Sequence, residues 1–513
     1  MIVEDQAAAV SLLMNPATHG DVGPVETIET HISRIFLVGD RAYKMKRAVK
    51  LPYVDFSTPE LRLAACTREV ELNSQTAPGL YLGVRRVTRE HEGEIALDGD
   101  GPLLDAVVEM TRFRQSSLLD RMALAGKLTP ELMTDVARMI VDFHRGAPPV
   151  HAGRGAANMA GVLDINAAGF ATSQVFEAGE IATFDAAFRA ALERHAALLD
   201  RRAAAGRIRL CHGDLHLRNI CLLDGVPRLF DCIEFNDTIA TIDVLYDVAF
   251  LLMDLWHRGF PALANLAANR YFDGSEDEDG FGLLPFFMAV RASVRAHVTA
   301  TQVAEGSRDP AGLAAEARSY FDLARDLLRE FPPRLIAIGG LSGSGKTTIA
   351  EALAAHVGAP PGARIVESDR IRKAMHGVPP ETRLPDSAYR PEISQKVYGE
   401  MARLSGIVLS EGGSVVVDAV FDRPADRERM ERIAGDRSLP FLGIWLEADP
   451  DMLRQRVSER RGGPSDATVD VLARQLRGWA GQTGWRGIDA ARTADAIVAE
   501  ILDDPRAGGD PAA

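Results

Sequence analysis

A glycine-rich segment, Gly340 to Thr347 (GLSGSGKT), constrains the fold of this 513-residue chain more than any other feature. It matches the pattern GxxxxGK followed by Ser or Thr, in which successive backbone N–H groups turn inward on phosphate oxygens. An apolar stretch at Leu335 to Ile338 precedes the segment, and a helical pattern that stops at Gly358 follows it. This order predicts an α/β domain with a parallel sheet and a phosphate-binding loop after one of its strands.

The side chains of this loop predict a nucleotide as the ligand. Lys346 brings a positive charge to the β- and γ-phosphates, and the hydroxyl of Thr347 is placed to hold Mg²⁺. We therefore expect ATP, with GTP as an alternative, together with Mg²⁺. The predicted nucleotide contacts are Gly340, Ser342, Gly343, Ser344, Gly345, Lys346, Thr347 and Thr348.

Two further strands of the predicted sheet lead into acidic residues. The stretch from Ala363 to Glu367 is followed by Asp369, and the stretch from Ser414 to Val417 ends at Asp418. Because the carboxyl ends of parallel strands meet at one edge of a sheet, both carboxylates are expected near the phosphate loop. An acid there can take the proton of an acceptor hydroxyl, whereas Asp418 can hold Mg²⁺ with its water or simply cap its strand.

The rest of this half carries arginines beyond a later strand, at 454, 456, 460 and 461, which can close over the γ-phosphate. Residues 334–502 thus resemble the P-loop small-molecule kinases, the group of gluconate kinase, chloramphenicol phosphotransferase, zeta toxins and polynucleotide 5′-kinase. The resemblance implies that Asp369 is the general base, that Arg372 helps to hold the acceptor, and that Arg456 and Arg460 belong to a lid. This lid lacks the His-Phe-Met-Pro stretch of gluconate kinases, which leaves the acceptor open.

A second constellation lies at residues 211–219 (CHGDLHLRN). Asp214 and Asn219 are five residues apart, and Asp231 follows Asp214 by seventeen residues, beyond a predicted hairpin. This spacing is typical of a kinase core, where a base lies on one side of the γ-phosphate and metal ligands lie on the other. His212 and His216 stand on a loop without a third ligand, which favours a structural role for both.

The HGDLHLRN pattern resembles the aminoglycoside-phosphotransferase and choline-kinase branch. The whole chain resembles a bacterial fusion of such a domain with a P-loop kinase domain. The resemblance implies that Asp214 is the base and that Asn219 and Asp231 are Mg²⁺ ligands. It gives no substrate, and no GxGxxG pattern lies in residues 20–40.

The same resemblance implies a strand lysine that grips the α- and β-phosphates and pairs with a helix glutamate. Lys44 and Lys46 are both candidates, because residues two apart point to one face of a strand. We favour Lys46 by its distance from the preceding turn, with Glu69 as its partner. We expect Asp243 and Asp247 to brace the catalytic loop from a helix beneath it.

The Pro332-Pro333 pair marks the predicted domain boundary, since helices usually end before a proline. We predict an N-terminal α+β domain of protein-kinase-like (aminoglycoside phosphotransferase) fold over 1–332 and an α/β P-loop kinase domain over 333–505. Residues 506–513 are expected to form a flexible tail. The segment 273–279 (DGSEDED) is expected to be an acidic loop. The aspartates and glutamates of 231–279 are expected to form a solvated acidic face, with attraction of a cationic acceptor as the alternative.

Composition excludes several classes of protein. The formal net charge of −14 argues against a protein that coats nucleic acid or an anionic membrane. No apolar run approaches the roughly 20 residues of a membrane span. The start of the chain lacks a basic segment of the secretory type. Four cysteines without CxxC spacing fit a reduced, cytoplasmic chain.

These observations predict a phosphotransferase with two sites, each moving the γ-phosphate of ATP to a hydroxyl of a small molecule. One alternative is a P-loop half that phosphorylates 5′-hydroxyl ends of nucleic acid. Residues 334–513 carry 24 basic and 26 acidic residues, which does not favour a basic channel. The other alternative is that one nucleotide site is regulatory. The acceptors, the oligomeric state and the coupling between the sites stay open.

Overall fold

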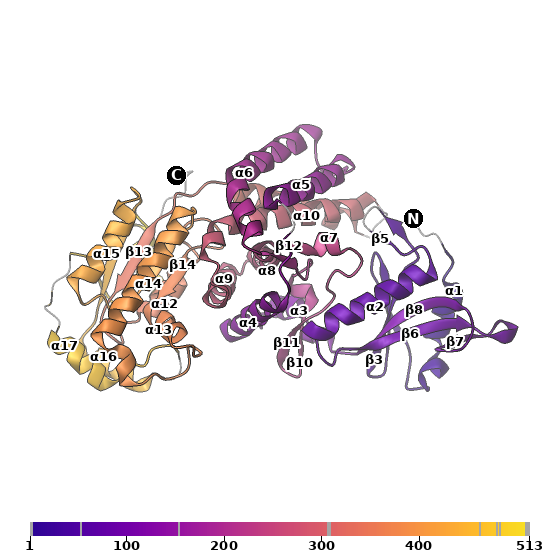
Figure 1. Ribbon diagram of the computed structural model, residues 1–513, viewed down its shortest axis with the longest axis horizontal. Helices are drawn as coiled ribbons and strands as arrows, with labels where there is room; N and C mark the ends of the chain where they lie inside the picture. The colour runs from indigo at the N-terminus through magenta and orange to yellow at the C-terminus, as the bar shows by residue number, and fades with distance from the viewer. Residues whose placement is uncertain are drawn as a thin grey trace. The chain divides into compact units, whose positions relative to one another are not determined.

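The computed structural model describes residues 4–51, 54–151, 154–304, 309–460, 463–478, 481 and 484–507. The chain folds into two compact units (Figure 1). Residues 1–158 and 200–251 form the first unit, and residues 159–199 and 252–513 form the second. The helices on the N-terminal side of the predicted boundary at 332/333 are therefore shared between the two units.

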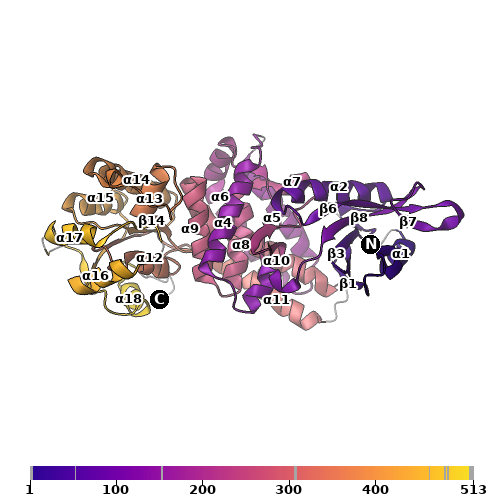
Figure 2. The same cartoon turned by 90° about the horizontal axis from the view of Figure 1, so that it is seen from below.

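The first unit contains an antiparallel sheet of six strands in the order β1-β2-β3-β8-β6-β7. Helix α2 (Pro59–Thr76) begins at a cap in which the Thr58 hydroxyl accepts from the Leu61 N–H, and Pro59 starts its first turn. It packs on the sheet along β6 and β8, as Figures 1 and 2 show. The strands are β1 (Glu26–Glu29), β2 (Ser33–Val38), β3 (Arg41–Lys46), β6 (Tyr81–Arg89), β7 (Ile95–Leu97) and β8 (Leu103–Thr111).

The second constellation of the sequence lies in two small strand pairs of the same unit. Asp224 and Gly225 both have positive φ, at 52° and 79°, which is the backbone that a two-residue hairpin turn requires. They join β10 (Ile220–Leu223) to β11 (Val226–Leu229), and β9 (Ile208–Leu210) pairs with β12 (Thr241–Asp243). Helices α4 (Pro130–Gly146) and α8 (Val244–His257) supply side chains that contact the loop after β9.

The second unit begins with helices that surround an aromatic core. Phe170, Phe176, Phe184 and Phe321 are mutually packed, with ring centroids 4.0–5.8 Å apart. The helices of this part are α5 (Gly155–Ala171), α6 (Ala178–Ala204), α9 (Pro261–Ser275), α10 (Leu284–Ala304) and α11 (Pro310–Leu327), with a 3₁₀ turn, η5 (Glu278–Leu283), after α9.

The second unit also contains the predicted parallel sheet, in the order β14-β15-β13-β16-β17 with every neighbouring pair parallel. The strands are β13 (Leu335–Gly339), β14 (Arg364–Glu367), β15 (Val415–Asp418), β16 (Phe441–Glu447) and β17 (Arg486–Asp489). The helices are α12 (Lys346–Ala354), α13 (Ser368–Met375), α14 (Pro391–Ser410), α15 (Pro424–Gly435), α16 (Pro450–Glu459), α17 (Val469–Gly478) and α18 (Ala494–Leu502). The predicted kinase-like and P-loop folds are both confirmed, although β17 was not expected.

Two local expectations were wrong. The segment 273–279 is not a solvated acidic loop, because Asp273 belongs to α9 and Asp277 and Glu278 are buried, and only Glu276 of its acidic residues is exposed. Of the expected tail 506–513, Arg506 pairs with Asp504 and Ala507 is buried in the core of the P-loop sheet, while 508–513 lie outside the described residues. Among the helices that the structure describes, none is long and apolar enough to cross a membrane.

Candidate functional sites

The glycine-rich segment forms a turn between β13 and α12. Gly340, Gly343 and Gly345 have φ of 148°, 88° and 89°, a region that residues with a Cβ rarely adopt. A Cβ on Gly343 would also lie 2.8 Å from the backbone oxygen of Leu453. The turn ends at the N-terminus of α12, where backbone N–H groups and the helix dipole favour an anion.

The side chains of this turn include one lysine and two buried serines. The Lys346 ammonium donates to the Leu341 carbonyl at 3.2 Å, and burial lowers the pKa of Lys346. The Oγ of Ser344 is buried and has no hydrogen-bond partner among the described residues. Ser342 is also buried, and Thr348 is exposed at the start of α12. The predicted contacts among residues 340–348 therefore lie together in the turn and in the first residues of α12.

Two carboxylates, Asp418 at the end of β15 and Asp369 in the first turn of α13, favour the charged form of Lys346. The Thr347 hydroxyl donates to Asp418 Oδ2 at 2.6 Å, and burial raises the pKa of Asp418 to about 6. Burial also raises the pKa of Asp369, whose carboxylate accepts from Ser465. A hydroxyl beside a buried carboxylate is a hard oxygen donor set that fits Mg²⁺.

The three predicted arginines have different surroundings. Arg372 is buried, donates to the Ala388 carbonyl at 2.7 Å and stacks over the ring of Tyr389. Arg456 donates to the Ala490 carbonyl at 3.1 Å. Besides burial, the positive charge of Arg460 is one of the causes of the lowered pKa of Lys346. Arg460 therefore acts electrostatically on the lysine of the phosphate loop. Arg461 lies outside the described residues.

Sequence reasoning missed three polar residues of this site. Ser465 donates to Asp369, and Gln475 Oε1 accepts from the Ser342 N–H at 3.0 Å. Asp466 accepts from Lys373 and from Tyr389, both at 2.6 Å, and thereby ties α13 to the loop before α17. They stand in or after a loop of small and polar residues, so no local pattern singles them out.

The loop after β9 holds the predicted base of the N-terminal site. The Asn219 amide donates to both the backbone oxygen and the Oδ2 of Asp214, each at 2.9 Å. The side chains of Asp214 and Asp231 are 40% and 41% exposed, so both carboxylates are accessible to a ligand. Together with the Asn219 amide oxygen, Asp231 offers oxygen ligands of the kind that Mg²⁺ takes.

Both candidate lysines contact Glu69. Its carboxylate lies 2.7 Å from the Lys44 ammonium and 2.5 Å from that of Lys46. Lys44 also contacts Asp231, whereas Lys46 is fully buried and contacts Glu234. Burial opposes the charged form of Lys44, but Asp231 and Glu69 outweigh it and raise its pKa. The contacts therefore favour Lys44 over Lys46, against our preference from the sequence, because Lys44 touches a predicted metal ligand.

A buried carboxylate of α8 holds the loop of Asp214 in place, as expected of Asp247. Asp247 accepts from the backbone N–H groups of His212 and Gly213, at 3.1 and 2.9 Å, and from His144 Nε2 at 3.1 Å. His212 in turn donates from Nε2 to the Phe230 carbonyl at 2.9 Å, which supports its structural reading.

Asp243, at the end of β12, forms a two-point ion pair with buried Arg202, at 2.8 Å for each contact. Asp243 and Asp247 therefore both make buried contacts that stabilise the fold, as the sequence predicted.

Two family models match the chain. The model described as "Phosphotransferase enzyme family" matches residues 66–283, and the model described as "AAA domain" matches residues 335–480. The first match contains the loop of Asp214 and Asn219 and also Asp231. The second contains the glycine-rich turn, Asp369 and Asp418.

Curated relatives match the chain at two scales. Uncharacterized protein Rv2004c of Mycobacterium tuberculosis is 30% identical over 458 residues, which cover 88% of this chain and 89% of that protein. The shikimate kinase of Thiobacillus denitrificans is 34% identical over 137 residues, or 26% of this chain and 66% of that enzyme. Among solved structures, a choline/ethanolamine kinase family protein from Mesorhizobium loti matches with 17% identity and a TM-score of 0.40. That match covers 63% of this chain and 94% of that one.

Proposed function

Since this chain belongs to the family that joins a phosphotransferase-enzyme domain to a P-loop kinase-like domain, we propose that it is a bifunctional ATP-dependent phosphotransferase. Each of two separate sites would move the γ-phosphate of ATP to a hydroxyl of a small molecule. The observation that carries this proposal is that each site combines a lysine, a candidate base and oxygen ligands for Mg²⁺ within one compact unit.

In the P-loop site, the chain's residues divide binding from proton transfer. When bound, ATP with Mg²⁺ supplies the phosphoryl group that is transferred. Thr347 and Asp418 would hold the metal, and Lys346 would balance the negative charge of the phosphates. Asp369 would accept the proton of the acceptor hydroxyl, with Arg372 holding the acceptor and Arg456 or Arg460 approaching from the lid. The raised pKa of Asp369 supports its work as a base, since a stronger base removes a hydroxyl proton more readily.

In the N-terminal site, Asp214 would accept the acceptor's proton, and Asn219 and Asp231 would hold Mg²⁺. Lys44 would grip the α- and β-phosphates while Glu69 fixes its ammonium from behind. Asp247 keeps the loop of Asp214 in place through two backbone hydrogen bonds. The two sites share none of these residues.

Small hydroxyl compounds are the proposed acceptors. Curated relatives of the P-loop half are named shikimate kinase and adenylyl-sulfate kinase, which supports this class of acceptor without choosing a member. A cytoplasmic location is proposed as well, because all four cysteines are buried as free thiols, which fits a reducing compartment.

Asp369→Asn in the full chain tests the proposal. Asparagine keeps the shape but cannot accept the proton, so transfer at the P-loop site should fall by about 10²–10⁴-fold with ATP binding retained. The assay follows γ-labelled phosphate from ATP into a pool of small metabolites. Asp436→Asn, an exposed change in the same sheet domain, is the matched control. Equal losses of affinity and rate would make Asp369 a binding residue, and labelling of an oligonucleotide 5′-hydroxyl would replace the small-molecule acceptor.

A further inference from the structure

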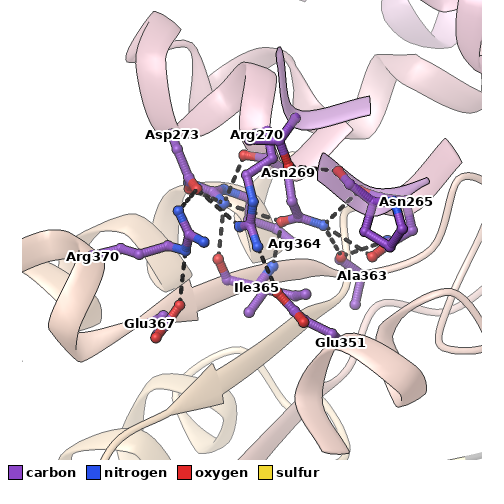
Figure 3. Close-up of polar contacts among 12 residues, drawn as sticks. Asn265, Asn269, Arg270, Asp273, Glu351, Ala363, Arg364, Ile365, Glu367 and Arg370 are labelled. Atoms are coloured by element: carbon purple, nitrogen blue, oxygen red, sulfur yellow. Dashed lines mark hydrogen bonds and ion pairs between the residues drawn. The ribbon is translucent and has the colours of Figure 1, made fainter. Parts of the chain in front are cut away.

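Strand β14 is the outer strand of the P-loop sheet, and two asparagines of α9 cap its free edge (Figure 3). The amides of Asn265 and Asn269 donate to the Ala363 carbonyl at 3.0 and 3.1 Å. Asn269 Oδ1 accepts from the Ile365 N–H at 2.7 Å. Both asparagines are at most 1% exposed, so they satisfy backbone groups that an uncovered edge would leave to water.

One carboxylate of α9 gathers three guanidinium groups beside this edge (Figure 3). Asp273 lies 3.2 Å from Arg270, 2.8 Å from Arg364 and 3.6 Å from Arg370. Burial alone would raise the pKa of Asp273, but the three arginines outweigh burial and lower it. Asp273 is therefore ionised and fixed, with partners on α9, β14 and α13.

Two of these arginines also contact glutamates beside the P-loop site (Figure 3). Arg370 donates to Glu367 at 2.9 Å, at the end of β14, and its neighbour in α13 is the candidate base Asp369. Arg270 donates to Glu351 of α12 at 2.5 Å. One turn of α9 thus contacts both the helix after the phosphate loop and the helix of the candidate base.

Backbone segments pack closely against α9 and against η5, the turn that follows it. A Cβ on Gly362, just before β14, would lie 2.9 Å from the Asn265 amide nitrogen. A Cβ on Gly282, in η5, would lie 1.9 Å from the backbone oxygen of Glu411. Backbones that approach this closely form a packed junction within the second unit, as dense as a protein interior.

We propose that α9 is a positioning element of the P-loop site, and that Asp273 holds Arg370 so that α13 presents Asp369 to the acceptor. This inference rests on the proposed role of Asp369. Helix α9 lies inside the segment that the phosphotransferase model matches, 66–283. A segment assigned to one kinase domain therefore sets the geometry of the other domain's site.

The test compares Asp273→Asn with Asp322→Asn, an exposed change on α11, in the full chain. Asparagine cannot form an ion pair with Arg370, so α13 should lose one of the contacts that fix its orientation. A displacement of about 1 Å can cost a reaction as much as 10²-fold, and we expect Lys346-dependent transfer in Asp273→Asn to fall at least about tenfold. The Kd of ATP should stay within about twofold, because the phosphate loop is intact. Hydrogen exchange of the amides 368–375 should quicken in Asp273→Asn and stay unchanged in Asp322→Asn.

A double-mutant cycle with Arg370→Gln separates positioning from a general loss of packing. If Asp273 acts through Arg370, the double variant should transfer phosphate no more slowly than Arg370→Gln alone. Multiplicative losses, equal losses of affinity and rate, or exchange rates like those of the control would overturn the proposal. The wild-type chain could fail to transfer phosphate while Asp273→Asn still quickens hydrogen exchange in 368–375. That result would overturn the proposed function but would support the positioning of α13 by Asp273.

Discussion

In the N-terminal site the ammonium groups of Lys44 and Lys46 lie against the carboxylate of Glu69, whereas in the P-loop site the ammonium of Lys346 donates to a backbone carbonyl. The pKa shifts follow this difference. Carboxylate neighbours outweigh burial and raise the pKa of Lys44, but burial prevails at Lys346 and lowers it. The first site is neutralised by its own side chains, and the second carries charges that burial penalises.

This difference concerns how each site is held together. Ion pairs between β3 and α2 form the N-terminal site, so the residues that would bind nucleotide also stabilise the fold. Backbone turns at glycines form the P-loop cradle, so its lysine is free to serve the ligand. Removal of the Glu69 charge should therefore lower the stability of the first site, whereas removal of the Lys346 charge should lower the activity of the second.

The largest expected effect separates the chemistry of the two sites. Asp214→Asn should lower N-terminal transfer by about 10²–10⁴-fold, because the amide cannot accept a proton. P-loop transfer should stay unchanged, since the two candidate bases belong to different compact units. Transfer of γ-labelled phosphate, resolved by product, measures both. Asp224→Asn is the matched control, because asparagine tolerates the positive φ of that hairpin turn. A change in the P-loop activity alone would make the N-terminal site regulatory.

Lys346→Ala should lower P-loop transfer by about 10²–10³-fold, the range for loss of one group that stabilises transition-state charge. The free energy of unfolding should change by less than about 1 kcal/mol, because the Lys346 ammonium donates to a backbone carbonyl and forms no ion pair among the described residues. Urea denaturation and the labelled-phosphate assay measure the two quantities. A large loss of stability would break the contrast with the N-terminal site.

Glu69→Gln should do the opposite and destabilise the fold by about 3 kcal/mol, since loss of one buried partner leaves uncompensated charge. Glu69 is fully buried against two ammonium groups. Urea denaturation measures the change, and Glu71→Gln on the exposed face of the same helix should stay within about 0.5 kcal/mol. If both glutamates cost the same, the ion pairs of α2 do not hold the site together.

The smallest expected effect decides between the two lysines. Lys44→Met should weaken ATP binding at the N-terminal site about tenfold more than Lys46→Met, because one charge-assisted hydrogen bond is worth roughly 1.5–3 kcal/mol. The Kd of ATP is measured in the Lys346→Ala chain, so that the P-loop site does not contribute. A larger effect at Lys46 would restore the preference drawn from the sequence.

The two candidate sites could be predicted from the sequence wherever a few neighbouring residues form them. The cradle at 340–347 and the loop from Asp214 to Asn219 are local patterns, and both form where they were expected. The choice between Lys44 and Lys46 could not be made from residues that neighbour them in the sequence. They share one strand face, and Asp231 and Glu234, nearly 190 residues later, distinguish them.

The prediction for the acidic segment 273–279 was wrong for the same physical reason. Asp273 and Glu278 looked like solvated charges because Arg270 is the one cation near them in the sequence, beside the acidic residues of 273–279. Their partner Arg364 comes 91 and 86 residues later, on an edge strand that nothing in 273–279 announces. The two asparagines of α9 are likewise ordinary polar residues until the fold brings β14 against them.

The cap that Asn265 and Asn269 form on β14 limits how the two parts of this chain can be separated in evolution. A P-loop segment separated from the chain at the Pro332-Pro333 pair would lose Asn265 and Asn269 and expose an unpaired strand edge. Bare edges pair with other chains and lead to aggregation. Recombination at that proline pair would thus produce a half with an aggregation-prone edge, although the break falls between the two family models. Selection for solubility alone would keep the two kinase-like parts on one polypeptide, even in an organism that needed the product of only one of them.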